Sequence, residues 1–511
     1  FSLGGDSIKA VQIASQLRNR GIGIDAKDIL TYHTIEQVSR RARAHDAATR
    51  YGHHPVSGRK GLFPIDGWFF GQQFRNPGYY NQSVLLRLHG TADVQRFEKA
   101  FRVLIGHHDG LRLNYDPRQG ELFYNNRHLE ADFVIERYAV PAGPDALAPL
   151  PVPYAALKGS FDITGDLLLK AALIEETGGA TFLFITAHHL VVDGVSWRIL
   201  LEDLYACYRA LEKGHTPRLP AKTAPLPEWH QALADYAQSG VPAGEEAYWQ
   251  DAESTAFALP LDCQTDDWRV ENRRVVTASL SREKTDFLLK EAHRPYKTDV
   301  PILLNTALAL TLNAWAGPGP WVVEQENHGR HLEQVDVSRT VGWFTVMYPL
   351  KLEAAGNALG DQIQAVKERL RNVPRQGLGY GVRNYLAQPR AGHGDRLSPV
   401  RFNYLGQFGQ ELHNDLFSLS RKPTGTDVDP ANRMTAVLEL NAMVVDGGLS
   451  LEIAYNEKAH RPATVQGLMT TFLEALDQVL EHVRNEQSVY FTPSDFQAVD
   501  LDQEELDALF R

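Results

Sequence analysis

Residues 181–200 read Thr-Phe-Leu-Phe-Ile-Thr-Ala-His-His-Leu-Val-Val-Asp-Gly-Val-Ser-Trp-Arg-Ile-Leu. The first seven are mostly β-branched, aromatic or aliphatic and follow a Gly-Gly turn, which predicts a buried strand. After Gly194 the apolar residues recur at helical spacing, which predicts a helix. Between them lies His188-His189-x-x-x-Asp193-Gly194. A histidine at such a strand end is held by a rigid scaffold and can face a cleft.

This placement suits a general base, because an unperturbed histidine titrates near physiological pH. The chain has 19 histidines, with further pairs at 53–54 and 107–108, so a structural role remains the commoner alternative for a pair alone. His-x-x-x-Asp also begins some metal sites. No third ligand follows at a recognisable spacing, so no metal is predicted.

Composition narrows the class of protein. A chain of 511 residues with 43% hydrophobic and 23% charged residues is typical of a globular protein with roughly three or four core units. The net charge of −11 argues against nucleic-acid binding. No apolar run approaches the roughly 18 residues of a membrane span. Two cysteines, Cys207 and Cys263, fit a reducing compartment, and we expect a cytoplasmic location.

Residues 1–45 predict a small helical unit that begins without a start methionine, as if cut from a longer polypeptide. Asp6-Ser7 is an N-cap sequence, Gly21 suits the helix end, and a second helix is expected over about 34–44. The first helix has one apolar face made of Ile8, Val11, Ala14 and Leu17. Gly4-Gly5-Asp6-Ser7 is either an ordinary turn and cap or a site where a phosphate on Ser7 meets free N–H groups.

The remaining chain divides into four further segments. Residues 46–61 lack periodicity and carry Gly and Pro breakers, which favours a linker. Strands and amphipathic helices then alternate, with a Pro-rich break at 216–227. We therefore expect two α/β lobes, 62–225 and 226–490, with a cleft between them. Residues 491–511 read as an acidic inter-module linker.

Individual elements follow from the periodicity of apolar residues. Strands are expected at 84–88, 167–174, 181–187, 275–280, 321–326, 400–404 and 449–455. Helices are expected at 94–105, 195–211, 246–252, 283–291, 302–315, 359–373 and 464–483.

Two motifs resemble those of nonribosomal peptide synthetases. His188–Gly194 resembles the HHxxxDG motif of the condensation superfamily, which includes condensation, epimerization and cyclization domains. Residues 3–8 (LGGDSI) resemble the phosphopantetheine-attachment motif of a peptidyl carrier domain whose first helix would precede Phe1. This implies covalent 4′-phosphopantetheine on Ser7, and Asp6 is typical of carriers that serve epimerization domains.

Five further stretches resemble epimerization-domain motifs in family order. Asp66 replaces Gln in the first stretch, Asn327 and His331 depart from the second, and Gly409 replaces Asp after the last. The stretches are 64–69 (PIDGWF), 326–331 (ENHGRH), 339–349 (RTVGWFTVMYP), 374–381 (PRQGLGYG) and 402–408 (FNYLGQF).

The resemblance implies a two-lobed chloramphenicol-acetyltransferase-like pseudodimer behind a truncated helical carrier domain. It implies an isomerase that interconverts L and D configuration at Cα of a carrier-bound aminoacyl or peptidyl thioester. The catalytic candidates are His189, Glu326 and Tyr404. His188, Asp193, Gly194 and Arg330 are expected to hold the motif. The implied partners are an upstream adenylation domain, a downstream condensation domain and a phosphopantetheinyl transferase.

The chemistry itself favours two groups on facing lobes. Inverting Cα needs one proton removed from one face and another delivered to the opposite face, and His189 with Glu326 would do this without metal or pyridoxal phosphate. Donors to the enolate oxygen are also needed, and Tyr404 and the N–H groups after Gly194 are candidates. Asp193 is expected to pair with an arginine, either Arg112 or Arg330.

Three alternatives stay open. A condensation domain, or a dual condensation/epimerization domain, would share the fold and form peptide bonds. A non-catalytic recruitment domain of the same fold would bind partner enzymes. Glu326 and Tyr404 within their motifs argue against these alternatives, because peptide-bond formation does not need that carboxyl and a recruitment platform needs neither base.

Overall fold

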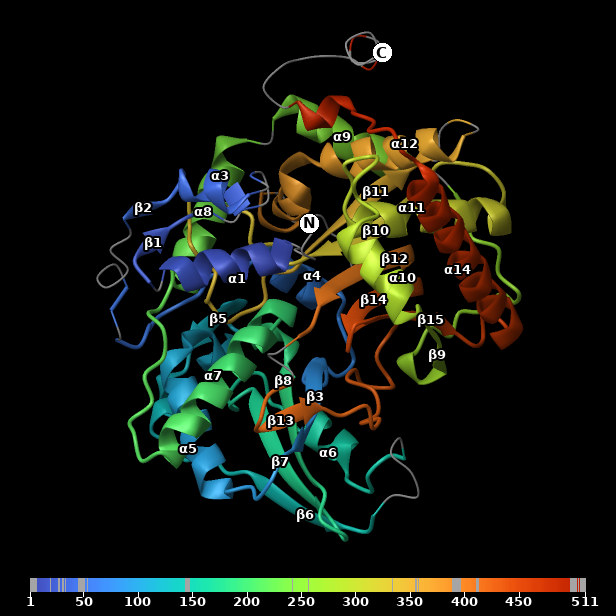
Figure 1. Ribbon diagram of the computed structural model, residues 1–511. Coiled ribbons are helices and arrows are strands. Elements are labelled where there is room, and N and C mark those ends of the chain that lie inside the picture. The colour runs from blue at the N-terminus through green and yellow to red at the C-terminus, as the bar shows by residue number, and fades with distance from the viewer. Residues whose placement is uncertain are drawn as a thin grey trace.

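The structure is a computed structural model of the 511-residue chain. It describes residues 7–18, 20–25, 28–29, 32, 34–44, 51–52, 54–142, 148–240, 242–255, 257–332, 334–353, 356, 358–387, 397–409, 413–496, 503 and 505. Beyond the N-terminal unit the described chain forms two lobes, each built on one large sheet (Figure 1).

The N-terminal lobe contains a five-stranded sheet in the order β13-β3-β8-β7-β6. All neighbours are antiparallel except β6 and β7. The strands are β3 (Asn81–Leu88), β6 (Glu136–Val140), β7 (Leu169–Glu176), β8 (Thr181–His188) and β13 (Phe417–Leu419). A separate hairpin joins β4 (Leu113–Asp116) to β5 (Glu121–Tyr124).

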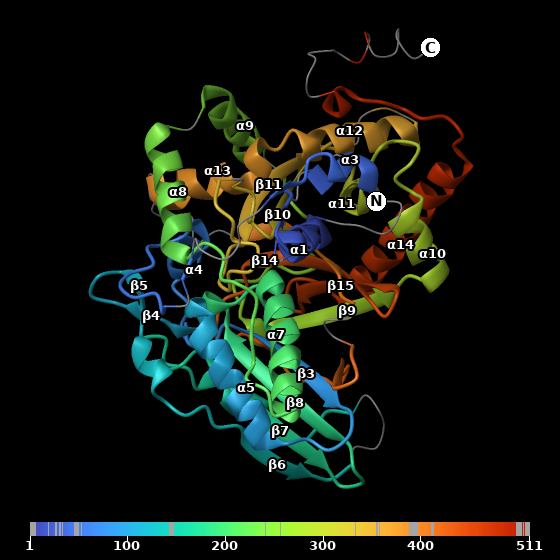
Figure 2. The same ribbon diagram turned by 60° about the vertical axis from the view of Figure 1, so that its left-hand side comes forward.

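Alternation along β8 explains why its sheet is covered on both faces. Phe184 packs against Tyr154 of α6 (Tyr154–Gly159), with ring centroids 4.8 Å apart. The opposite face packs under α5 (Val94–His107) and α7 (Gly194–Glu212), which lie side by side in Figures 1 and 2. The buried rings of Phe97 and Tyr208 join these two helices at 4.3 Å.

The C-terminal lobe contains a six-stranded sheet in the order β11-β10-β12-β14-β15-β9. Its β10–β12 and β12–β14 pairs are parallel and the others antiparallel. The strands are β9 (Arg273–Ser279), β10 (Trp321–Asn327), β11 (Val346–Leu352), β12 (Ser398–Gln407), β14 (Ala436–Val445) and β15 (Gly448–Asn456).

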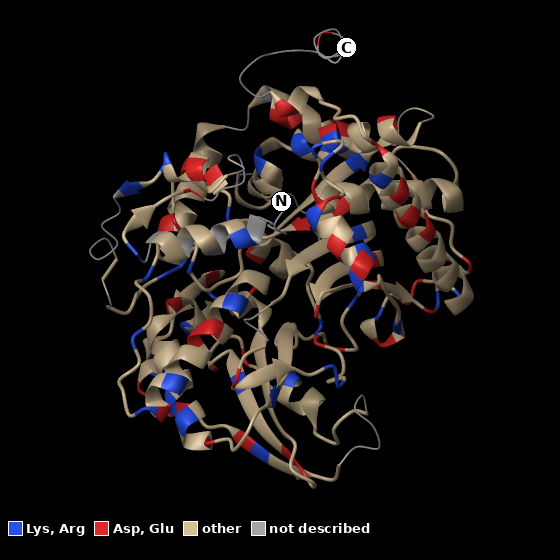
Figure 3. Ribbon diagram, in the orientation of Figure 1, with Lys and Arg blue, Asp and Glu red and all other residues tan. Residues whose placement is uncertain are grey.

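Helices cover one face of this sheet, where Asn305 of α11 exchanges hydrogen bonds with Gln325 of β10. The opposite face carries Glu324 and Glu326. The remaining helices are α4 (Pro64–Gly71), α8 (Leu226–Ser239), α9 (Ala243–Ser254), α10 (Arg282–Lys290), α11 (Val300–Ala316), α12 (Leu359–Arg371), α13 (Leu378–Gly381) and α14 (Pro462–Asn485). Acidic and basic residues are intermixed along the helices of both lobes (Figure 3).

One expected element needs correction, and two contacts bear on the expected boundaries. The second carrier helix is shorter than 34–44, because α3 (Ile35–Ser39) ends before β2 (Arg43–Ala44), which pairs with β1 (Ile22–Gly23). The division at residue 225 does not separate the sheets fully, since β13 from the C-terminal half pairs with β3 (Figure 1). The tail begins docked: Lys367 and Arg371 of α12 both bind the Asp495 carboxylate at 2.5 Å.

Candidate active site at the lobe junction

The His-His-x-x-x-Asp-Gly segment occupies the break between a buried strand and a helix. β8 ends at His188, a single 3-10 turn spans His189–Val191, and α7 begins at Gly194. The Asp193 side chain caps α7 by accepting the Ser196 N–H at 2.7 Å. The strand, turn and cap together fix the backbone that carries both histidines.

His188 is fully used by internal hydrogen bonds. Its Nε2 donates to the Pro77 carbonyl at 2.7 Å, and its Nδ1 accepts the Leu190 N–H at 3.1 Å. Complete burial lowers its pKa to about 3, so the ring is neutral at physiological pH. Both ring nitrogens of His188 therefore have partners within the protein.

His189 presents a basic nitrogen instead. Its Nδ1 lies 2.8 Å from the Val192 carbonyl, which only accepts, so Nδ1 carries the ring proton. Its Nε2 therefore holds a lone pair, which accepts the Gln82 side-chain N–H at 2.8 Å. Burial lowers the His189 pKa to about 4, although the Val192 bond and the Asp193 charge oppose the shift. At neutral pH the ring is therefore a free base.

Aromatic rings form the wall around this base. The Trp343 ring stacks on His189 with centroids 4.1 Å apart, and the Tyr80 ring lies at 5.8 Å. Trp68 and Trp343 meet edge-on at 6.3 Å. Trp68 and Trp343 are buried, as are Trp197 and Phe344.

Asp193 joins the two lobes through Arg330. Arg330 Nη2 donates to both Asp193 carboxylate oxygens at 3.0 and 3.1 Å, and the Phe344 N–H donates to the second at 3.1 Å. Arg330 also donates to the Val337 and Thr340 carbonyls. The expected arginine partner is thus Arg330. Arg112 pairs with Asp109 instead.

The start of α7 offers fewer donors than expected. The Ser196 N–H is already bonded to Asp193, so it is removed from the candidate donors to an enolate. A Cβ on Gly194 would meet no other atom within 4 Å. Packing therefore does not require glycine there, and space remains beside the helix N-terminus.

Glu326 lies near the end of β10 and has two partners. Its Oε2 accepts the Asn403 side-chain N–H at 2.8 Å, and its Oε1 lies 3.5 Å from Arg401 Nε. Burial raises the Glu326 pKa to about 7, since the attraction of Arg401 is offset by Glu439 and Glu324. A carboxyl with this pKa exchanges protons readily at neutral pH. Tyr404 follows Asn403 on β12 and is half-buried.

His189 and Glu326 lie on two sides of one aromatic cluster. Trp343 contacts His189, and Trp68 contacts both Trp343 and the Arg401 guanidinium, whose Cζ lies 5.7 Å from the Trp68 ring. Arg401 in turn lies beside Glu326. The structure thus brings the two predicted bases to the same lobe junction.

Sequence reasoning missed three members of this site: Gln82, Asn403 and Arg401. Asn403 lies inside the 402–408 motif, so that motif was a signal from which it could have been found. Gln82 had no signal, because its place beside His189 depends on the antiparallel register that sets Gln82 opposite Ala187.

Residue Ser7 is the first residue of α1 (Ser7–Arg18); its side chain lies outside the described residues. A helix N-terminus suits an attached phosphate, because its N–H groups and dipole favour negative charge. Two residues later Lys9 Nζ donates to Gln407 Oε1 of β12 at 2.8 Å. The start of α1 is therefore held against the large domain at Gln407, which lies on the same strand as Tyr404.

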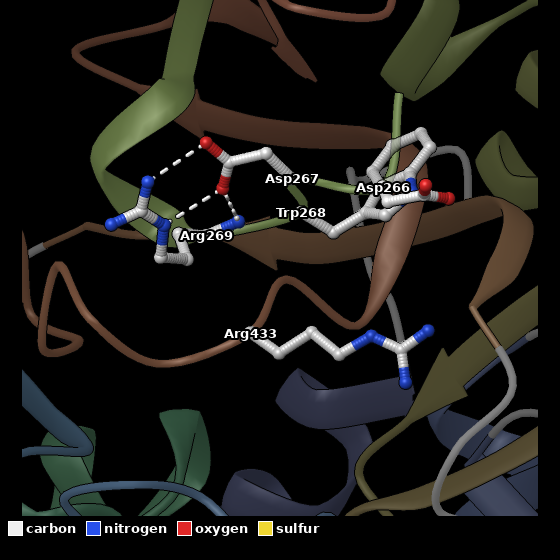
Figure 4. Close-up of a pocket in the computed structure, with 5 residues that line it drawn as sticks. All are labelled: Asp266, Asp267, Trp268, Arg269 and Arg433. Atoms are coloured by element: carbon white, nitrogen blue, oxygen red, sulfur yellow. Dashed lines mark hydrogen bonds and ion pairs between the residues drawn. The ribbon is translucent and has the colours of Figure 1, made fainter. Parts of the chain in front are cut away.

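A second hollow, of about 600 Å³, is unrelated to this junction. It is lined by Asp266, Asp267, Trp268, Arg269 and Arg433 (Figure 4). Asp267 and Arg269 pair with each other through two hydrogen bonds of 2.8 Å. The described residues include no cluster of metal-ligating side chains and no helix long and apolar enough to cross a membrane.

Comparison with known proteins identifies the family. Residues 62–501 match the family described as "Condensation domain", and residues 1–42 match "Phosphopantetheine attachment site". The chain belongs to the condensation-domain family. Its N-terminal unit is a carrier domain that bears covalent 4′-phosphopantetheine, and the described helix start fits that group. The fold is the mixed α/β condensation fold that the resemblance implied.

Relatives and solved structures agree with this assignment. Surfactin synthase subunit 1 of Bacillus subtilis (strain 168) is 38% identical over the whole chain, which spans 14% of that protein. Tyrocidine synthase 1 of Brevibacillus parabrevis is 34% identical, and the chain spans 48% of it. The epimerization domain from the third module of tyrocidine synthetase B is 31% identical, with a TM-score of 0.77, covering 85% of this chain and 100% of that one. The X-domain from teicoplanin biosynthesis shares the fold, with 20% identity, 84% and 97% coverage and a TM-score of 0.64.

Proposed function

We propose that this condensation-family chain is a carrier–epimerization didomain of a nonribosomal peptide synthetase. It interconverts L and D configuration at Cα of an aminoacyl or peptidyl thioester attached through phosphopantetheine to Ser7. Residues 1–45 are the carrier, 46–61 the linker, 62–225 and 226–490 the two lobes, and 491–511 the inter-module linker. The observation that carries the proposal is the pairing of a neutral His189 with a Glu326 carboxyl whose pKa is raised to about 7.

The resting protonation states suit opposite tasks. At neutral pH His189 Nε2 holds a lone pair that takes the Cα proton, while the protonated fraction of Glu326 delivers a proton to the other face. The reverse reaction uses the reversed states, so both groups must cycle. The phosphopantetheine supplies the thioester, which acidifies the Cα–H by delocalising charge onto its oxygen.

The base alone is insufficient. A mismatch on the order of ten pKa units between Cα–H and base would cost over roughly ten kcal/mol. Each donor aimed at the enolate oxygen contributes roughly 3–4 kcal/mol. In the proposal Tyr404 is one such donor. The open space beside Gly194 favours approach of the thioester to the start of α7.

Gln82 occupies the basic nitrogen of His189 and must yield to substrate. Its N–H bond to Nε2 occupies the single in-plane lone pair of the neutral ring. The substrate Cα–H therefore displaces this amide before proton transfer. His189 Nδ1 keeps its proton throughout and donates it to the Val192 carbonyl, which stabilises the imidazolium that forms.

The partners follow from the same proposal. A phosphopantetheinyl transferase modifies Ser7, an upstream adenylation domain loads it, and a downstream condensation domain receives the D-configured group. The names of the relatives, surfactin and tyrocidine synthases, support a place in the assembly of a secondary metabolite, such as a peptide antibiotic, that contains a D-amino acid.

The test separates epimerization from peptide-bond formation. The holo protein is loaded with an L-aminoacyl or L-peptidyl pantetheine, alone or with an acceptor amine on a second carrier. We expect the hydrolysed product to drift to an L/D mixture, with Glu326→Gln abolishing the drift. Amide formation with retained L configuration would instead establish a condensation domain. If neither reaction occurs, the result would favour a recruitment domain.

A further inference from the structure

A cavity of about 410 Å³ lies on the sheet face that bears Glu326. Successive side chains on a strand alternate between faces, so Val322, Glu324 and Glu326 of β10 share one face. Val322 and Glu324 line the cavity. Glu326 is the next side chain along this face.

The side chains of β10 form the floor of this cavity, and cross-strand neighbours on β11 and β12 extend the floor on both sides. Glu324 lies opposite Pro349 of β11 and Arg401 of β12, and both line the cavity. Glu326 lies opposite Met347 and Asn403. Met347 is also a lining residue, so the cavity reaches the position directly beside Glu326.

Aromatic side chains opposite this floor form the roof of the cavity, and they connect it to His189. Trp68 of α4 lines it and packs edge-on against Trp343, which stacks on His189. Tyr380 and Tyr385 extend the roof, and α9 lies above this end of the sheet in Figures 1 and 2. The cavity thus lies beside the residues that contact both bases, and it extends along β10 from Glu324 to Val322.

Resting on the proposed function, we propose that this cavity binds the peptidyl part of the substrate, upstream of the residue being inverted. From Glu326 to Val322 is four strand residues, a length of about 13 Å. An extended peptide of about four residues spans that length, whereas the side chain of the inverted residue does not reach it. The volume also lies within the roughly 300–1,000 Å³ of sites that enclose ligands larger than one side chain.

The lining favours an uncharged segment. Arg401 pairs with Glu324 at 2.6 Å, and Glu253 pairs with Arg383 at 2.9 Å. The described lining carries no other Asp, Glu, Lys or Arg. Around these pairs the walls are apolar or aromatic, while Ser398, Thr345 and Thr435 offer polar groups to peptide N–H and C=O. A charged side chain in the upstream peptide would find no unpaired partner there.

The test compares deuterium uptake at Cα in heavy water for holo protein loaded with aminoacyl or with tri- or tetrapeptidyl pantetheine of one C-terminal residue. We expect at least tenfold faster exchange for the uncharged peptidyl forms than for the aminoacyl form or a peptide with an upstream Glu. Val322→Trp, which fills the far end, should remove the peptidyl advantage and leave aminoacyl exchange unchanged. Val275→Trp, at a half-exposed position on edge strand β9, is the matched control and should change neither rate.

The outcomes distinguish the two levels of proposal. Exchange at equal rates for both substrates, unaffected by Val322→Trp, would overturn the cavity assignment and leave epimerization intact. No exchange with any substrate in the parent protein would overturn the proposed function and the cavity assignment with it. Thermal melts check that Val322→Trp folds, and Met347→Phe is the second filling variant.

Discussion

Asp193 and Arg330 connect the two lobes by a buried ion pair in which one guanidinium nitrogen binds both carboxylate oxygens, at 3.0 and 3.1 Å. The side chains are 3% and 1% exposed. Asp193 also caps α7 and accepts the Phe344 N–H. The motif aspartate thus holds the helix start, the neighbouring lobe and the turn that carries His189 in one arrangement.

Asp193→Ala should therefore destabilise the protein. It would leave the Arg330 charge buried without its carboxylate, which typically costs about 3–5 kcal/mol. The melting temperature and the urea midpoint should both fall clearly. Asp267→Ala, which removes a carboxylate from an exposed arginine pair, is the control and should change both little. An Asp193 variant that is inactive but fully stable would show a direct role in proton transfer instead.

Gln82→Leu should impair epimerization while preserving the fold, because the amide positions the His189 ring. A loss of roughly 100-fold is typical when a reacting group is misplaced by about 1 Å. Removing the N–H donor to Nε2 also destabilises the neutral ring, so the His189 pKa should rise. The acid limb of the pH–rate profile would then move to higher pH. The exposed control Gln231→Leu on α8 should leave the acid limb unchanged. An unchanged acid limb in Gln82→Leu as well would show that Gln82 does not hold down the His189 pKa.

Glu326→Gln should change how stability depends on pH. The folded-state pKa of about 7 lies above the ordinary value of 4.5, so the folded protein binds more protons between these values. Stability is therefore lost as pH rises through that window. The Gln variant should be more stable than the parent at pH 8, by on the order of 1–3 kcal/mol, and show no such gain below pH 4.5. Urea unfolding at both pH values measures the difference, and equal stabilities at pH 8 would contradict the raised pKa.

Ser7→Ala should prevent phosphopantetheinylation and loading while the large domain stays folded, since Ser7 is the first residue of α1 in the separate carrier unit and even loss of a helix cap costs only about 1 kcal/mol. Intact mass spectrometry after incubation with a phosphopantetheinyl transferase and coenzyme A gives the readout. A phosphopantetheine mass increment in this variant would move the attachment site. Ser39→Ala, on α3 of the same unit, is the control and should still be modified.

Much of the fold could be read from periodicity. The strand–turn–helix around His189 and the helices at 302–315 and 464–483 lie within β8, α7, α11 and α14. Strand β11 was not predicted, because Pro349 interrupts its pattern, and proline is tolerated there since β11 is an edge strand. Strand β13 is three residues long and joins the sheet by pairing with the distant β3, which local patterns do not encode.

Some features of the candidate site could likewise be predicted from the sequence, and others could not. An arginine partner for Asp193 could be predicted in advance, because a buried carboxylate before a helix needs one, but only the structure chooses Arg330 over Arg112. The Asp66 that departs from the family motif is explained only by the structure, where it caps α4 and binds buried Lys60. Likewise Gln82 and Arg401 become site residues through sheet register, and the raised pKa of Glu326 through burial, neither of which one sequence displays.

The most direct test of two-base epimerization is deuterium incorporation at Cα of the loaded thioester in heavy water, measured by mass spectrometry with chiral analysis. We expect rapid exchange and an L/D mixture in the parent, and severe loss of configuration change in both His189→Ala and Glu326→Gln. Exchange from only one enantiomer in either variant would identify the face on which the surviving base acts. Full configuration change in the Glu326 variant, or amide formation without exchange in the parent, would contradict the two-base assignment.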